Sequence, residues 1–210
     1  QSACVAGIVP PSRTEVGTTV IAGEGQPQSG VRFATGAHLA SGQTSRERRF
    51  DVGAGMVYER LAAPPLGSQE RPLAAAPTPP SAGQPPEVLD AYGTYVDAAA
   101  VVQRGRWHRT WLGARSELLR QEGPTGPHAV SATFARVAWE TYAPAHAAGG
   151  FSSSNAFGAG FAYGSFALGL FLESGIRTTD GERPAFVAIG GMSLRMPWLG
   201  GFAIDLTPKW

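Results

Sequence analysis

The histidines are the first residues in this sequence that could do chemistry, and their spacing does not suit a metal ion. His38, His108, His128 and His146 lie far apart, and none is four residues from another. The sequence has no G-x-S-x-G elbow, no Walker loop and no convincing dinucleotide fingerprint. A hydrolytic serine/histidine/acid set remains an alternative, with His38 or His108 beside Ser116. We therefore expect no catalytic residue, no metal site and no cofactor.

The single cysteine and the charge balance exclude further functions. Cys4 has no second cysteine to pair with, so neither an intrachain disulfide nor a cysteine metal site can form. The net charge is +1 and no Lys/Arg cluster occurs, so we expect no nucleic-acid partner. Gln-Ser-Ala precedes Cys4, much as small residues precede the cysteine of a lipoprotein processing box, which makes Cys4 a candidate for lipidation. A free thiol in a loose tail is the alternative. The start at Gln1 suggests an exported chain that has lost its signal peptide.

Large apolar side chains alternate with small or charged ones along most of the chain. This period of two is typical of β-strands with two unlike faces. The clearest run alternates Phe166, Leu168, Leu170 and Leu172 with small residues such as Gly169. No run of about 20 apolar residues could form a transmembrane helix. The recurring hairpins predict an all-β fold, an antiparallel up-and-down β-barrel.

Eight such runs predict eight barrel strands. They cover residues 30–41, 48–61, 88–103, 106–120, 129–141, 166–178, 185–196 and 200–207. Adding 14–22 and 155–162 gives a ten-stranded alternative. We expect an N-terminal tail over 1–29, with a possible short strand, followed by the barrel domain over 30–210.

Two long loops interrupt the predicted barrel. Residues 62–87 are rich in proline, which cannot donate to a sheet ladder, and residues 142–165 are rich in glycine, alanine and serine. Eight strands place the proline-rich loop at the same end as the chain termini, where turns of membrane barrels are short. Ten strands move it to the opposite end.

The charged residues of these runs lie in phase with glycines and alanines. A face open to water has no reason to lack medium-sized polar side chains, whereas a narrow closed barrel needs small residues to make room for a few long charged ones. Five arginines and six acids nearly cancel, as buried charges should. We predict that the following side chains form ion pairs inside the barrel: Arg32, Asp51, Glu59, Arg109, Arg115, Glu117, Arg136, Glu140, Glu173, Arg195 and Asp205.

Aromatic residues near the ends of the runs favour a membrane barrel over a soluble one. Alternation alone is compatible with both kinds of barrel, because the apolar face of a strand lies inside a soluble barrel and outside a membrane barrel. Trp and Tyr prefer the membrane–water interface. The candidates for that position are Tyr58, Trp107, Trp139, Trp198 and Trp210.

The hairpins from residue 31 onward resemble the small outer-membrane β-barrels of Gram-negative bacteria, the OmpA, OmpX and OmpW type. The end of the chain is similar to the aromatic-ended assembly signal of that superfamily, through Phe202, Ile204, Leu206, Pro208 and Trp210. The likeness covers most of residues 30–210. It implies an address in the cell outer membrane and contact with outer-membrane lipid.

We therefore expect a non-enzymatic outer-membrane barrel with an ion-paired, plugged interior and little or no conductance. It would act as an envelope anchor or as a subunit of an envelope complex, contacting other envelope proteins through 62–87 and 142–165. One alternative is a soluble periplasmic or secreted lipocalin-like barrel that binds an apolar ligand. Another is an outer-membrane lipid hydrolase. The first reading requires large apolar residues such as Phe33, Phe50 and Phe186 to point away from the barrel axis.

Overall fold

The computed structural model consists almost entirely of β-strands. It describes residues 4–9, 11–23, 27–41, 49–63, 87–123, 126–144, 161–163, 165–196 and 198–205. These residues form the strands β1 to β11 and one short 3-10 helix, η1 (Leu39–Ser41). Within these ranges, no helix is long and apolar enough to cross a membrane.

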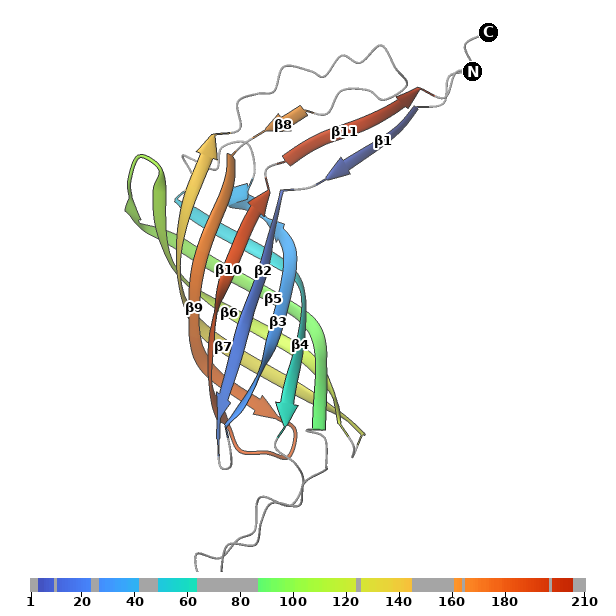
Figure 1. Cartoon of the computed structure of the whole chain (residues 1–210), viewed down its shortest axis with the longest axis vertical. Helices are drawn as coiled ribbons and strands as arrows, with labels where there is room; N and C mark the ends of the chain where they lie inside the picture. Colours follow the sequence, from blue (N-terminus) through green and yellow to red (C-terminus); the bar gives the residue numbers. More distant parts are fainter. Residues whose placement is uncertain are drawn as a thin grey trace, which may run out of the picture.

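Eight of the strands form a closed antiparallel barrel (Figure 1). They are β2 (Ser12–Ala22), β3 (Gln28–His38), β4 (Phe50–Ala63), β5 (Glu87–Arg104), β6 (His108–Gly123), β7 (Gly126–Pro144), β9 (Ser165–Thr179) and β10 (Ala185–Met196). Neighbouring barrel strands follow one another along the chain, and β10 pairs with β2 from Phe186↔Ala22 to Met196↔Ser12. The prediction of an all-β, eight-stranded up-and-down barrel is confirmed.

The two ends of the barrel differ in the connections between their strands. We call the end where β2 begins and β10 ends the terminal end, and the other the turn end. The tight hairpin between β5 and β6 lies at the terminal end. Residues 64–86 connect β4 to β5 at the turn end, where Ala63 and Glu87 are direct register partners.

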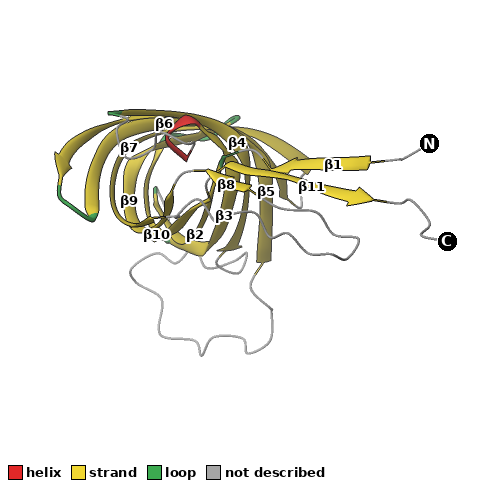
Figure 2. Ribbon diagram, turned by 90° about the horizontal axis from the view of Figure 1, so that it is seen from above, coloured by secondary structure: helices red, strands yellow, loops and turns green. Residues whose placement is uncertain are grey.

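A small three-stranded sheet lies beyond the terminal end. Its order is β1 (Cys4–Val9), β11 (Trp198–Asp205) and β8 (Phe161–Tyr163). Its ladder continues the seam that closes the barrel, because Val9 pairs with Leu199 and Ser12 pairs with Met196. In Figure 2, β1 and β11 run side by side away from the ring of barrel strands.

The structure corrects two strand assignments. Residues 12–22, which we placed in the tail, form the first barrel strand, whereas the predicted last strand over 200–207 corresponds to β11, outside the barrel. β2 has the same two faces as the other barrel strands, with charged Arg13 and Glu15 inward and Val16 outward. Both inner charges lie at the beginning of the strand, next to Pro10 and Pro11, and the rest of the inner face is uncharged.

The other seven predicted strands overlap β3 to β7, β9 and β10. The barrel therefore has the predicted number of strands but starts one strand earlier. As a result, β4 ends and β5 begins at the end opposite to the start of β2, the arrangement expected for ten strands. Of the optional strand 155–162, only the last two residues are described, and they belong to β8.

Candidate functional site

Inside the barrel, Glu15 on β2 holds three arginines from three strands. Its carboxylate lies 2.7 Å from Arg13 Nε, 2.7 Å from Arg115 Nη2 and 2.6 Å from Arg136 Nη2. Arg115 comes from β6, on the opposite side of the ring of strands, and Arg136 from the neighbouring β7. All four side chains are buried, so each charge depends on the others for compensation.

Arg115 extends this network to two further strands. Its Nη1 lies 3.1 Å from Glu173 on β9, and its Nη2 lies 3.3 Å from Asp97 on β5. Glu173 is shared with Arg136, and Asp97 is shared with Arg13. Shared partners turn the pairs into one continuous network across the lumen.

A second group of contacts lies toward the terminal end, around Arg195 on β10. This guanidinium places Nη1 2.7 Å from Asp51 and Nε 2.8 Å from Glu140. Glu140 also accepts hydrogen bonds from Trp111 Nε1 at 2.6 Å and from the Tyr142 hydroxyl at 2.7 Å. The terminal end of the lumen is therefore filled by hydrogen-bonded aromatic side chains as well as by ions.

His38 belongs to the same group of contacts, because it shares Asp51 with Arg195. Its Nδ1 lies 3.1 Å from Asp51 Oδ2, and its Nε2 lies 3.0 Å from the Tyr95 hydroxyl. The ring lies directly over Gly53, where an added Cβ would come within 2.1 Å of His38 Cε1. Glycine at position 53 therefore makes the space that lets His38 reach both partners.

Two more pairs lie toward the turn end. Arg32 on β3 donates to Glu117 on β6 through both terminal nitrogens, with Nη1 at 2.9 Å from Oε2. Arg177 on β9 pairs with Glu59 on β4 and donates to Gln121 Oε1 at 2.6 Å. Both pairs span the lumen between strands that are not neighbours in the barrel.

The buried charges of the described lumen cancel. Seven arginines and seven acids are buried there: Arg13, Arg32, Arg109, Arg115, Arg136, Arg177, Arg195, Glu15, Asp51, Glu59, Asp97, Glu117, Glu140 and Glu173. Arg109 lies over the Tyr142 ring, with Cζ 4.6 Å from the ring centroid. In such a lumen the buried arginines and acids neutralise one another, so they do not need water to compensate their charges.

The outer face of the barrel is apolar. Phe33, Phe50, Leu170 and Phe186 are 43%, 69%, 56% and 55% exposed, and all point away from the barrel interior. Every one of the eight barrel strands carries exposed large hydrophobic residues. The orientation that we required for a membrane barrel is therefore present.

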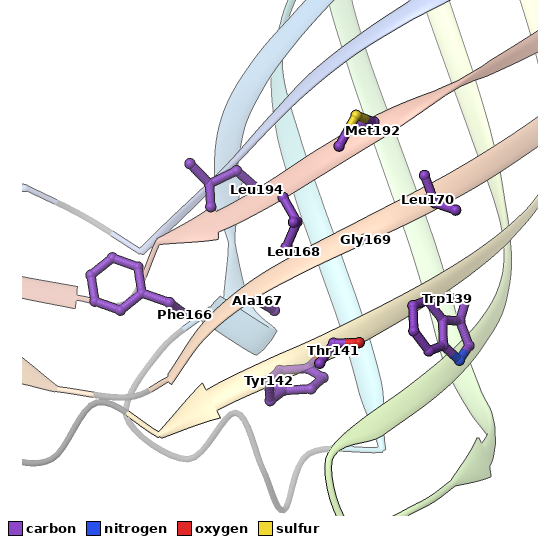
Figure 3. Close-up of a pocket in the computed structure, with 10 residues that line it drawn as sticks. All are labelled: Trp139, Thr141, Tyr142, Phe166, Ala167, Leu168, Gly169, Leu170, Met192 and Leu194. Carbon is purple, nitrogen blue, oxygen red and sulfur yellow. The ribbon is translucent and has the colours of Figure 1, made fainter.

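A shallow apolar hollow interrupts this outer face on β7, β9 and β10. Its volume is about 450 Å³. Figure 3 shows Trp139, Phe166, Leu168, Leu170 and Leu194 around it. Seven of its ten lining residues are exposed on the outer face, and Tyr142, Ala167 and Gly169 are the buried ones.

Charged side chains on the outer face gather in one place. Among the described side chains of the eight strands, four charged ones face outward: Arg60, Asp90, Arg120 and Glu122, near the turn end. Arg60, Asp90 and Glu122 are register partners on β4, β5 and β6. Tyr58 donates to Asp90 at 2.7 Å and Tyr92 to Glu122 at 3.1 Å. We call these four charged residues and two tyrosines the polar patch.

The structure shows where most of the predicted site residues lie. Ten of the eleven predicted interior charges are buried in the lumen. Asp205 is the exception: it lies on β11 opposite Cys4, outside the barrel, because β11 is not a barrel strand. Among the aromatics, Tyr58, Trp107 and Trp139 are roughly half-exposed. The side chains of Cys4 and Trp198, and the whole of Trp210, lie outside the described part.

Sequence reasoning missed five interior residues, namely Arg13, Glu15, His38, Asp97 and Arg177. Arg177 is in phase with Glu173 on a strand that we did predict, so alternation alone could have found it. For the run 88–103 we could not choose a face, since each carries an aspartate. The structure turns Asp97 inward with Tyr95 and leaves Asp90 outside.

The structure does not bring the proposed hydrolytic residues together. Ser116 is exposed on the outer face of β6, whereas His38 is buried in the lumen. His108 lies eight positions from Ser116 on the same strand, about 26 Å away at the usual rise. No group of three or more metal-ligating side chains occurs among the described residues.

Comparisons with known proteins found no matching family model, no matching curated protein and no matching solved structure.

Proposed function

We propose that this chain is a non-enzymatic outer-membrane β-barrel protein of a Gram-negative bacterium. In this proposal the barrel is an anchor with a closed lumen, and the connections 62–87 and 142–165 present it to other envelope proteins. One observation supports the membrane location above all others. The polarity of the barrel is reversed relative to a soluble protein, with charges buried and large apolar side chains outside.

Water is a poor solvent for this outer face. Soluble monomers rarely expose contiguous apolar patches of more than a few hundred Å². Here exposed Val, Leu, Phe, Met and Ile side chains surround the barrel, and charges on its outer face are confined to the polar patch. Lipid chains would solvate such a belt, and the apolar hollow adds a further surface for them. A membrane-spanning strand needs about 9–11 residues, and the barrel strands have 11 to 19.

The lumen supports an anchoring role better than a transport role. Arginines and acids from opposite walls meet in its centre, so a solute would have to break buried ion pairs to pass. The same charges disfavour the alternative of a soluble barrel that binds an apolar ligand, because that function needs an apolar lumen. No observation favours the lipid hydrolase.

Paired substitutions on β9 test the membrane location. Leu172 lies at the middle of this strand and is 69% exposed, whereas Thr178 faces the same way near the strand end. In lipid vesicles, Leu172→Arg should lower the free energy of unfolding by about 2–4 kcal/mol and Thr178→Arg by about 0–1 kcal/mol.

The measurement is urea unfolding of the barrel refolded into vesicles, followed by tryptophan fluorescence. If the barrel were soluble, both residues would face water. Both arginine variants would then fold without detergent or lipid and would be about as stable as the unsubstituted chain. That result would overturn the proposal.

A further inference from the structure

The tip of the β5–β6 hairpin holds a small pocket at the terminal end. Figure 1 shows this hairpin, in green, projecting at the upper left. The pocket has a volume of about 190 Å³ and is lined by Arg104, Arg106, His108 and Arg109, together with the aromatic rings of Trp107 and Tyr142. None of its lining residues is acidic. The pocket borders the terminal end of the lumen, because Arg109 is one of the buried lumen arginines and Tyr142 also donates to Glu140.

A shift in the strand register brings two of the arginines of this pocket together. The pairing of β5 with β6 shifts between Val101 and Gln103, and beyond the shift Arg104 lies directly opposite Arg109. Like charges at directly opposed positions of a sheet are destabilising. Bulges of this kind often re-aim side chains beside functional sites. The hairpin therefore concentrates cations at a cost in stability.

Contacts with the protein hold these cations in place. The guanidinium of Arg109 lies 4.6 Å from the Tyr142 ring centroid, and that of Arg106 lies 5.2 Å from the Trp107 ring centroid. The hairpin is closed by a hydrogen bond from Gly105 N to the His108 carbonyl oxygen at 2.9 Å. Arg104 makes further contacts within the protein. A ligand would thus meet partly positioned donors.

We propose that this pocket binds a phosphate group. Guanidinium groups match phosphate oxygens with two parallel hydrogen bonds, and three arginines around one small pocket supply more donors than a carboxylate could use. The favoured source is the headgroup of an anionic lipid. Trp107 at the tip is 46% exposed, and Trp139 stacks on His108 with ring centroids 6.2 Å apart. Such half-exposed tryptophans suit the headgroup level of a membrane.

The lipid source rests on the membrane location proposed above, whereas affinity for phosphate does not. A binding experiment in detergent micelles therefore separates the two. The folded full chain is titrated with phosphatidic acid, with diacylglycerol of the same chains and with inorganic phosphate, and native mass spectrometry counts the bound ligands. The test variant is Arg104→Gln/Arg106→Gln. The matched control is Arg60→Gln/Arg120→Gln, which removes two outward arginines that pair with acids at the other end.

Phosphatidic acid should bind the unsubstituted chain, and diacylglycerol should not. Arg104→Gln/Arg106→Gln should weaken phosphatidic acid binding about tenfold or more, since each lost hydrogen bond involves a charged donor. The control variant should bind as the unsubstituted chain does. Equal weakening in both variants, or equal binding of diacylglycerol, would overturn the proposal. Binding of inorganic phosphate as tight as that of the lipid would keep the pocket but replace the lipid by a soluble phosphate.

Discussion

Arg115 on β6 and Glu15 on β2 meet across the barrel lumen at 2.7 Å, although 100 residues separate them in the sequence. Because β2 and β6 stand on opposite sides of the ring, this pair ties the two walls together. Arg13 and Arg136 share the same carboxylate. Glu15 is therefore the acid whose loss would take one partner from the largest number of buried guanidinium groups.

Replacing Glu15 by glutamine should destabilise the barrel strongly. Removing one partner of a buried ion pair leaves an uncompensated charge and typically costs about 3–5 kcal/mol. The control is Glu122→Gln in the exposed polar patch, where an ion pair contributes about 0–1 kcal/mol. Urea unfolding in lipid vesicles measures both. A loss of similar size in the two variants would show that the central network stabilises the barrel no more than the exposed polar patch does.

The contact of His38 with Gly53 allows a test by double substitution. An alanine Cβ at position 53 would collide with the His38 ring and displace it from Asp51 and Tyr95. Gly53→Ala should therefore lower the free energy of unfolding by about 1–3 kcal/mol, the usual cost of overpacking. In a His38→Ala background the collision is absent.

A double-mutant cycle separates the collision from other effects. Its four proteins are the unsubstituted chain, Gly53→Ala, His38→Ala and the double variant. We expect Gly53→Ala to cost little once His38 is alanine, which gives a coupling of about 1 kcal/mol or more between the two positions. The free energies come from urea unfolding under one set of conditions. Additive effects of the two substitutions would contradict the view that glycine is needed there for the histidine.

Except for the run 88–103, where each face carries an aspartate, the sequence was sufficient to separate the two faces of each strand, because alternation is a local property. The phase of Glu173 among its neighbours places it on the inner face without knowledge of any other strand. The same holds for Arg32, Arg136 and the outward Leu170. Of the eleven charges predicted inside the barrel, ten are buried in the lumen.

Pairing between strands could not be predicted, because it depends on residues far apart in the chain. The sequence offered both 14–22 and 200–207 as barrel strands, and only the closure of β10 onto β2 decides between them. Which arginine meets Glu15 depends in the same way on strand register around the whole ring. The register shift next to Gln103, which brings Arg104 opposite Arg109, also leaves no signal in the alternation.

The filled lumen predicts that the barrel does not conduct ions. The described interior holds equal numbers of buried arginines and acids, and its terminal end is occupied by Trp111, Tyr142 and Arg195. In planar bilayers the refolded protein should give no steady ohmic current, whereas a 16-stranded porin in the same bilayer should, because its wider barrel leaves an aqueous channel. A steady channel of nanosiemens scale would contradict the closed lumen.

The long connection at the turn end should be dispensable for folding but not for binding partners. Ala63 and Glu87 are direct register partners, as are Gly123 and Gly126, and only residues 124–125 join the latter pair. Replacing 64–86 by the two-residue turn Asn-Gly should therefore leave the barrel intact. Its free energy of unfolding should rise by up to about 2 kcal/mol, since each halving of a loop recovers about 0.6 kcal/mol.

If the connection recruits envelope proteins, the shortened barrel should still insert into vesicles but should no longer co-purify with partners of the full chain. A reversed sequence of residues 64–86 is the control, because it keeps the length and composition and changes only the order of side chains. Failure of the shortened chain to fold would mean that these residues support the barrel itself. Unchanged co-purification of both variants would place the partner contacts elsewhere, leaving 142–165 as the remaining proposed segment.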